Sequence, residues 1–339
     1  MDHDEARQAK THALGLAREL VERHVRPAGL DDRPMVPLAL GLAPRPDGGY
    51  ALAVRYRLGV PQVRALARRV AADAGPGADV RRTGRVRPLA GGAPRLAGGP
   101  GPRPRPPVVT ARAVGETGRV RPLRPGVSVA HVDVTAGTLG AFVTVGGVLH
   151  ALSNHHVLAG APGARVGDLV LQPGPADGGT APDDRIGTLA ASVPLRAGVT
   201  AHVDAALALL DTQDVDPTYP VGRVTTTATA LGGERVLKTG RTTGTTRGRV
   251  TAIELDDVVV GYGDDLGDVR FDDQIEVEGL GPDPFSRGGD SGSLVVREDG
   301  VALGLLFAGS ETGGENGRGL TYVNPVDAVL TALDASLLG

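Results

Sequence analysis

The spacing of apolar positions predicts two helices and three strands in the first part of the chain. Residues 4–24 and 61–71 carry apolar side chains every three or four residues, which is typical of amphipathic helices. An apolar run over 36–42 and an alternating run over 50–58 are separated by a Pro/Asp/Gly turn signal, which indicates a hairpin with a loop longer than two residues. With a further strand over 78–89, the pattern predicts a small α+β unit of order α-β-β-α-β.

The pattern changes after this unit. Residues 90–107 are rich in Pro, Gly and Arg and cannot bury a core, so we expect a linker there. From about Val127, short runs of Val, Leu and Ala alternate with Gly-containing turn signals, which is the pattern of an all-β sandwich or barrel. The expected strands and the terminal helix are residues 137–144, 148–152, 205–210, 234–238, 249–255, 293–296, 303–307 and 324–333. The sequence therefore predicts an N-terminal domain over 1–89, a linker over 90–107 and a mainly β domain over 108–339.

Composition narrows the class of protein. Hydrophobic residues make up 41% of the chain and charged residues 22%, which is usual for a soluble globular protein. The chain contains no cysteine, which excludes a disulfide framework and a thiolate metal site. Its first residues lack the basic patch and apolar run of a signal peptide, and no run of about 18 apolar residues exists. We therefore expect a cytoplasmic protein with no transmembrane helix and no membrane partner.

One basic stretch interrupts an otherwise balanced charge distribution. The whole chain has a formal net charge of −3, but eleven arginines, no lysine and a single acid (Glu116) lie between Arg81 and Arg124. Such a stretch could attract nucleic acid or an acidic partner. No aromatic residue is interleaved to stack on bases, so we favour a solvated linker and do not expect nucleic acid as a partner. The heptapeptide Thr-Gly-Arg-Val-Arg-Pro-Leu occurs twice, over 83–89 and 117–123, either as two equivalent strand ends or by chance in a biased composition.

The sharpest chemical signal is the segment Gly288-Gly-Asp-Ser-Gly-Ser293. A serine that attacks an acyl group must stand on a tight turn, with two backbone N–H groups converging where the oxyanion forms and nothing bulky at the scissile carbonyl. Ser291 stands between small residues here, Gly289 and Ser291 can donate those N–H groups, and Gly292 lets the chain leave at once. Taken alone, the segment is equally well explained by a Gly/Ser/Asp surface loop before a strand.

A serine nucleophile needs a base that is held by a carboxylate. The segment Leu152-Ser-Asn-His-His-Val-Leu158 places His155 and His156 in a polar cluster between two apolar runs. Asp204 directly precedes a strongly apolar strand, where a carboxylate would be partly buried. No zinc-ligand spacing accompanies the two histidines, so we expect neither a metal site nor another cofactor. The order histidine, aspartate, serine therefore favours a triad that ends at Ser291.

Four motifs follow one another along the chain. They are Leu152-Ser-Asn-His-His-Val-Leu-Ala159, Val203-Asp-Ala-Ala206, Lys238-Thr-Gly-Arg-Thr-Thr-Gly244 and Asp283-Pro-Phe-Ser-Arg-Gly-Gly-Asp-Ser-Gly-Ser293. Together they resemble the chymotrypsin/trypsin-like serine peptidases and, more narrowly, a bacterial trypsin-like group related to the plant Narrow Leaf proteins. The resemblance covers residues 121–325. It implies a mainly β fold, a double β-barrel of trypsin-like type with the active site in the cleft between the barrels, here preceded by the small α+β unit.

The resemblance also implies the roles of individual residues. His156, Asp204 and Ser291 would form the catalytic triad, and the N–H groups of Gly289 and Ser291 would form the oxyanion hole. His156 holds the position before valine that the motif gives to the base, so its neighbour His155 is expected to face solvent.

An alternative carboxylate is Asp211, which lies at the far end of the apolar strand that Asp204 precedes.

The pocket for the side chain that precedes the cleaved bond is implied in the same way. Phe285 takes the position at its base, and Leu306-Phe-Ala-Gly309 resembles its wall, with Phe307, Ala308 and Gly309. A Lys or Arg head group would lie unpaired against this apolar surface, whereas an apolar side chain is stabilised by burial. We therefore expect cleavage after small or medium apolar residues, with Phe285 limiting the depth of the pocket.

The sequence thus predicts a serine endopeptidase that hydrolyses peptide bonds through an acyl-enzyme, with protein or peptide substrates. The alternative is a catalytically idle trypsin-like scaffold that binds protein partners. The sequence leaves open the natural substrate, homo-oligomerisation, the role of the N-terminal unit and the control of activity.

Overall fold

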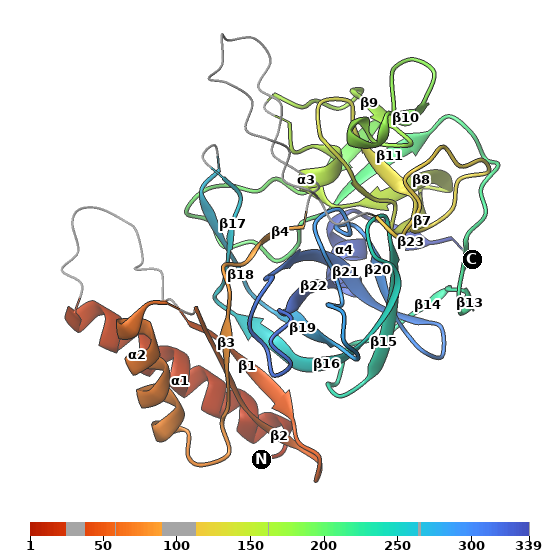
Figure 1. The fold of residues 1–339 in the computed structure, drawn as a ribbon. Helices are drawn as coiled ribbons and strands as arrows, with labels where there is room; N and C mark the ends of the chain where they lie inside the picture. Colours follow the sequence, from red (N-terminus) through yellow and green to blue (C-terminus); the bar gives the residue numbers. More distant parts are fainter. Residues whose placement is uncertain (25–37, 58, 90–112, 162, 264–265, 339) are drawn as a thin grey trace.

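The fold is mainly β, with a small α+β unit beside two barrel-like bodies of antiparallel strands (Figure 1). The computed structural model describes residues 1–24, 38–57, 59–89, 113–161, 163–263 and 266–338. The predicted linker over 90–107 lies outside these residues. The arrangement confirms the predicted fold class, a double β-barrel preceded by an α+β unit. No helix within the described ranges is long and apolar enough to cross a membrane.

The N-terminal unit follows the apolar spacing of its sequence. It contains α1 (His3–His24), β1 (Leu38–Pro44), β2 (Tyr50–Arg57), α2 (Pro61–Asp73) and β3 (Asp79–Thr83). α2 begins at Pro61, where the fixed φ of proline suits the first helical position. Buried Ala, Leu and Val side chains of both helices and of β1 and β2 form one apolar cluster. β2 and β3 run parallel, as strands joined through a crossover helix can.

The first barrel is an open sheet. Its strands are β5 (Ser128–His131), β6 (Gly137–Thr138), β7 (Ala141–Val145), β8 (Val148–Ser153), β9 (Leu169–Leu171), β10 (Arg185–Ser192), β11 (Ala206–Leu210) and β23 (Ser336–Leu337). They pair in the order β23-β7-β8-β11-β10-β9-β5-β6. Two short helical segments lie between these strands, α3 (His155–Leu158) after β8 and η1 (Pro175–Asp177) after β9. Apolar side chains such as Phe142, Leu149 and Val170 fill its interior.

The second barrel is closed. Its strands are β15 (Arg235–Gly240), β16 (Gly244–Asp256), β19 (Gln274–Gly279), β20 (Leu294–Arg297), β21 (Val301–Gly309) and β22 (Thr321–Pro325). They pair in the order β15-β20-β21-β22-β19-β16, and β15 also pairs with β16, which joins the two ends. α4 (Val326–Ala332) follows β22 directly. The remaining short strands are β12 (Thr218–Tyr219), β13 (Gly222–Arg223), β14 (Thr226–Thr227), β17 (Val258–Gly261) and β18 (Asp268–Phe271).

The N-terminal unit is joined to the second barrel by backbone pairing. β1 pairs with β16, so the sheet of the unit continues into the barrel. The sequence predicts one strand over 78–89, but the chain forms β3 and then a separate strand, β4 (Arg87–Pro88). β4 pairs with β21 on the barrel. The end of the unit therefore reaches the second barrel.

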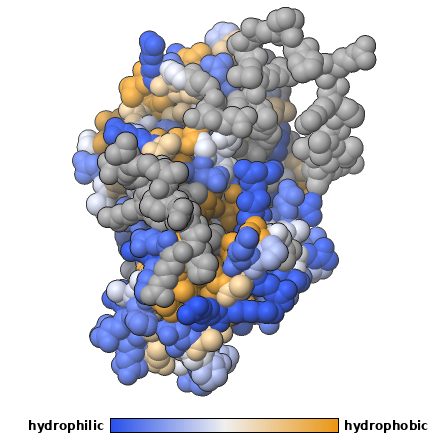
Figure 2. Space-filling model, turned by 90° about the vertical axis from the view of Figure 1, so that its left-hand side faces the viewer, coloured by the Kyte–Doolittle hydropathy of each residue, from blue (hydrophilic) through white to orange (hydrophobic). Residues whose placement is uncertain are grey.

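The outer surface of the N-terminal unit is largely hydrophilic. Figure 2 shows this in the lower part of the molecule, where the unit lies in Figure 1. On α2, Arg64, Arg68 and Arg69 are exposed, whereas Val63, Ala67 and Val70 are buried. The apolar face of the helix therefore points inward.

Several arginines of the basic stretch are paired within the chain. Arg119 lies 3.3 Å from Asp184, and Arg124 pairs with Glu116. The central part of the stretch, residues 90–112, lies outside the described residues.

Candidate active site

His156, the candidate base, lies on the single turn of helix that follows β8. β8 ends at Ser153, Asn154 is extended, and α3 then buries the side chain of His156. Nδ1 of His156 lies 2.5 Å from Oδ2 of Asp204, and the backbone N–H of His156 donates to Oδ1 at 3.2 Å. An ionised carboxylate can only accept hydrogen bonds, so Nδ1 carries the proton. Nε2 is therefore the basic nitrogen.

Asp204 is fully buried immediately before β11 and is held from several sides. Its backbone carbonyl accepts from Nδ2 of Asn154 at 2.6 Å, and its backbone N–H donates to Oδ1 of Asn324 at 2.9 Å. The hydroxyl of Tyr262 donates to Oδ2 at 2.6 Å. Burial raises the pKa of Asp204, but the charge of His156 and the hydrogen bonds from His156 and Tyr262 outweigh burial and hold the pKa below its usual value. Asp204 therefore stays ionised beside the imidazole.

Ser291 stands on a tight turn that only glycines permit. Gly289 and Gly292 have φ values of +98° and +94°, in the region that residues with a side chain rarely adopt. The N–H groups of Gly289 and Ser291 both donate to the carbonyl oxygen of Leu89, the latter at 3.4 Å. Two backbone donors that converge on one peptide carbonyl have the arrangement of an oxyanion hole.

The hydroxyl of Ser291 is turned away from the base in this structure. Its Oγ donates to the carbonyl of Phe307 at 3.1 Å. Nε2 of His156 is buried and has no hydrogen-bond partner among the described residues. No hydrogen bond therefore joins Ser291 to His156 among the described residues, and an attack by Ser291 would first require its hydroxyl to leave Phe307.

A buried ion pair stabilises the turn that carries Ser291. Nζ of Lys238 lies 3.3 Å from Oδ2 of Asp290, and both side chains are shielded from solvent. Oδ1 of Asp290 also accepts from the backbone N–H groups of Thr242 and Thr243, at 2.9 and 3.1 Å. The loop between β15 and β16 thus holds Asp290, the residue that precedes Ser291. Burial lowers the pKa of Lys238, an effect that the Asp290 carboxylate offsets only in part.

We expect Lys238→Met to destabilise the protein by about 3–5 kcal/mol, because it leaves the Asp290 carboxylate buried and unpaired. Urea unfolding of parent and variant measures this free energy. As a control, Arg297→Met breaks the exposed pair between Arg297 and Asp299, which should change stability by no more than about 1 kcal/mol. Equal effects of the two substitutions would contradict the supporting role of Lys238.

Among the described residues, no hydrogen bond joins the side chains of His155 and Asp211 to His156, Asp204 or Ser291. His155 was expected to face solvent, but it is only partly exposed, and its Nδ1 is buried without a hydrogen-bond partner among the described residues. Burial lowers the pKa of His155, so the neutral form is favoured. Asp211 lies at the other end of β11, where it pairs with Arg185 at 2.9 Å.

The residues expected to form the substrate pocket are placed in two groups. Phe285 is buried in the apolar cluster that also contains Leu89. A Cβ atom on Gly309 would lie 3.1 Å from a methyl group of Leu89, so Gly309 leaves room for this side chain. Phe307 and Ala308 belong to a different cluster, in which the Phe307 ring lies 4.7 Å from that of Phe271. Phe307 therefore contributes its backbone carbonyl here, not its ring.

Four functional contacts were not anticipated from the sequence. Tyr262 and Asn324 hold Asp204, Lys238 neutralises Asp290, and the carbonyl of Leu89 accepts the N–H groups of Gly289 and Ser291. Only Lys238 carried a local signal, because it is one of two lysines in the chain and directly follows the apolar pair Val236-Leu237. The other contacts join segments that are far apart in the sequence.

No protein-family model and no curated protein matches the sequence. Among solved structures, the chain is similar to protease A of Thermobifida fusca, with a TM-score of 0.44 and 20% identity over 64% of this chain and 98% of that chain. It is similar to a chymotrypsin of Cellulomonas bogoriensis, with a TM-score of 0.43 and 22% identity over 64% and 98%. A Nocardiopsis protease gives a TM-score of 0.45 and 21% identity over 64% and 99%. These similarities are distant. The relation to the Narrow Leaf proteins stays a prediction.

Proposed function

We propose that this protein is a serine endopeptidase in which Ser291 is the nucleophile, His156 the base and Asp204 the carboxylate that orients the base. The observation that carries the proposal is the convergence of the Gly289 and Ser291 N–H groups on the carbonyl oxygen of a peptide segment. The His156–Asp204 pair supports it independently, because its geometry leaves Nε2 as the proton acceptor.

The chemistry follows from these positions. The hydroxyl of Ser291 attacks the carbonyl carbon while His156 takes its proton, and Asp204 stabilises the imidazolium that forms. The negative charge that develops on the carbonyl oxygen is held by the N–H groups of Gly289 and Ser291. His156 then returns the proton to the leaving amine, and water hydrolyses the acyl-enzyme by the same route in reverse. The substrate class is therefore a protein or peptide, whereas the oligomeric state and the cytoplasmic location stay predictions.

The pocket favours an apolar residue before the cleaved bond. Phe285 and the aliphatic side chain of Leu89 share one apolar cluster, and Gly309 leaves space beside Leu89. A Lys or Arg side chain would have to bury its charge among these groups without a partner, at a cost on the order of several kcal/mol.

A peptide library tests both the activity and this preference. Because the carbonyl of Leu89 already accepts the N–H groups of Gly289 and Ser291, the library is offered to the Leu89→Asp variant, with Leu89→Asp/Ser291→Ala as the matched inactive control. We expect cuts mainly after small or medium apolar residues, identified by mass spectrometry. Dominant cleavage after Lys or Arg would refute the pocket assignment. No cleavage by a folded variant would favour the idle scaffold.

A further inference from the structure

The substrate position of the candidate active site is occupied by the chain itself. The carbonyl oxygen of Leu89 accepts the N–H groups of Gly289 and Ser291, and the N–H of Leu89 donates to the carbonyl of Phe307 at 3.2 Å. An oxyanion hole defines where the attacked carbonyl lies. The carbonyl carbon of Leu89 is therefore at the position where Ser291 would attack.

The residues before Leu89 bind as an added strand. β4 pairs antiparallel with β21, with Arg87 opposite Gly309. On the other side, the N–H of Gly261 at the end of β17 donates to the carbonyl of Val86 at 3.1 Å. Extended peptides bind to sheet edges in this way, because backbone hydrogen bonds hold them while side chains enter pockets. The segment is thus held on both sides as a peptide substrate would be.

The side chain of Leu89 fits the pocket in size and polarity. It is 8% exposed and is buried in the same apolar cluster as Phe285. A Cβ atom on Gly309 would approach its methyl groups to 3.1 and 3.5 Å, so a larger residue at 309 would crowd it. Leucine also belongs to the class of medium apolar residues that the pocket is expected to accept.

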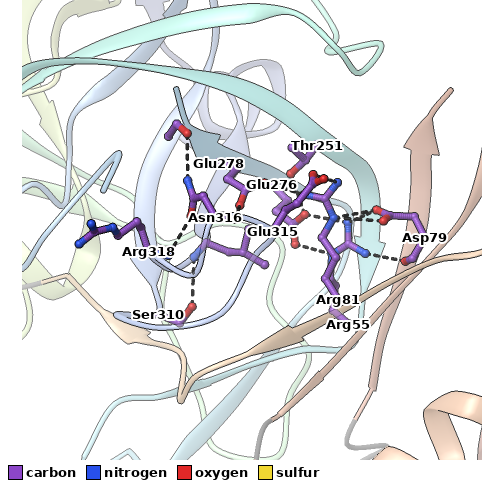
Figure 3. A network of polar contacts seen from close by, with 12 residues as sticks. Arg55, Asp79, Arg81, Thr251, Glu276, Glu278, Ser310, Glu315, Asn316 and Arg318 are labelled. Atoms are coloured by element: carbon purple, nitrogen blue, oxygen red, sulfur yellow. Dashed lines mark hydrogen bonds and ion pairs between the residues drawn. The ribbon is translucent and has the colours of Figure 1, made fainter. Parts of the chain in front are cut away.

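A buried polar network docks the N-terminal unit against the second barrel (Figure 3). The guanidinium of Arg55, on β2, donates to both carboxylate oxygens of Glu276, on β19, at 2.7 and 2.8 Å. It also donates to Asp79 at 2.8 Å, while Arg81, on β3, donates to Glu278 at 2.7 Å. Arg55 and Glu276 are shielded from solvent. Together with the β1–β16 pairing, these bonds fix the orientation of the unit. Its last residues, β4 and Leu89, are thereby placed beside Ser291.

We propose that the N-terminal unit, residues 1–89, is an inhibitor in cis, and that the peptide bond following Leu89 is the first substrate of the enzyme. This rests on the proposed function. Cleavage within the molecule leaves the unit bound, with the new carboxylate of Leu89 between the same N–H groups. Proteins and peptides reach the cleft only when the unit has dissociated or has been degraded.

The proposed cleavage of the bond between Leu89 and Ala90 consumes one water molecule. Oγ of Ser291 bonds to the carbonyl carbon of Leu89, and its proton passes to Nε2 of His156. The bond from Leu89 to the nitrogen of Ala90 breaks, and that nitrogen takes the proton and becomes a free amine. Water then adds to the acyl-enzyme through His156, which releases the Leu89 carboxylic acid and restores the serine hydroxyl.

The second copy of the heptapeptide provides an internal control. Residues 83–89 and 117–123 are identical, and each ends in leucine. Leu123, however, is fully buried in the core of the first barrel, and its carbonyl accepts from the N–H of Asp216 at 2.8 Å. Docking therefore predicts a cut after Leu89 only, whereas recognition of local sequence alone would allow a cut after Leu123 as well.

The full chain, purified and incubated alone, should separate into two fragments that meet between Leu89 and Ala90. Intact-mass measurement and N-terminal sequencing identify the position. Because the bond is delivered within one molecule, the rate should not depend on protein concentration. Ser291→Ala should stay intact. Cuts at both heptapeptide copies, or a rate that rises with concentration, would overturn delivery in cis.

Leu89→Asp tests inhibition separately from cleavage. Placing a carboxylate in the apolar pocket should weaken docking of the tail, so reaction with a fluorophosphonate probe and hydrolysis of an apolar peptide should rise by about 10- to 100-fold over the freshly prepared parent. Leu231→Asp is the control, because Leu231 is 61% exposed on a loop of the second barrel. It should behave as the parent does.

The outcomes separate the inference from the proposed function. If the parent stays uncut after Leu89 and reacts with the probe as fast as Leu89→Asp, the unit is not an inhibitor, while the peptidase assignment stands. If neither folded protein takes the probe nor cleaves peptide, the proposed function fails, and the inference fails with it.

Discussion

Ser291→Ala should lower the rate of peptide hydrolysis by about 10⁴- to 10⁶-fold, because no other group in the site can form the acyl-enzyme. In the structure the hydroxyl makes one hydrogen bond, to the carbonyl of Phe307 at 3.1 Å. Its loss costs stability on the order of 1 kcal/mol, so the variant should fold. Initial rates with an apolar peptide, measured in the Leu89→Asp background to keep the cleft open, give the ratio.

The neighbouring Ser293 provides a matched control. Its hydroxyl donates to the carbonyl of Asp290 at 2.7 Å and serves the turn, with no part in the attack. Ser293→Ala should therefore retain most of the activity. Hydrolysis that persists undiminished in Ser291→Ala would show that Ser291 is not the nucleophile.

His156→Ala should reduce turnover about as much as Ser291→Ala, on the order of 10⁴- to 10⁶-fold, because members of a triad act as a unit. The reason is specific to its position: Nδ1 is held at 2.5 Å by Asp204, and Nε2 has no competing partner among the described residues. The same peptide assay measures the loss. Thermal unfolding shows whether the variant remains folded.

His155→Ala distinguishes the two adjacent histidines. No described hydrogen bond joins the His155 side chain to Asp204, so this variant should retain most of its activity. The reverse result, with His155 essential and His156 dispensable, would show that His155 is the base and that His156 was assigned wrongly.

The fold was predictable where local patterns are strong. Amphipathic spacing indicated α1 and α2, and apolar runs indicated β8, β11 and β21. β9 was missed because it is only 3 residues long. β19 was missed because it carries Glu276, a fully buried carboxylate that is neutralised by Arg55 from the N-terminal unit. A residue of this kind looks exposed in the sequence, because its partner comes from a distant segment.

The site was predictable only where its residues belong to local sequence motifs. Motif order suggested His156, Asp204 and Ser291, and the structure brings the first two into direct contact. The supporting bond from Tyr262 to Asp204 spans segments with no shared pattern, so nothing local could indicate it. Leu89 was read as the end of an ordinary strand, because its role depends on docking of the whole N-terminal unit.

The most direct test of the central claim is mass spectrometry of the Leu89→Asp chain after reaction with a fluorophosphonate probe. The account predicts one phosphonyl group per chain, located on Ser291 and absent from Leu89→Asp/Ser291→Ala. A folded chain that takes no label, or a label on another residue that survives in the double variant, would contradict it.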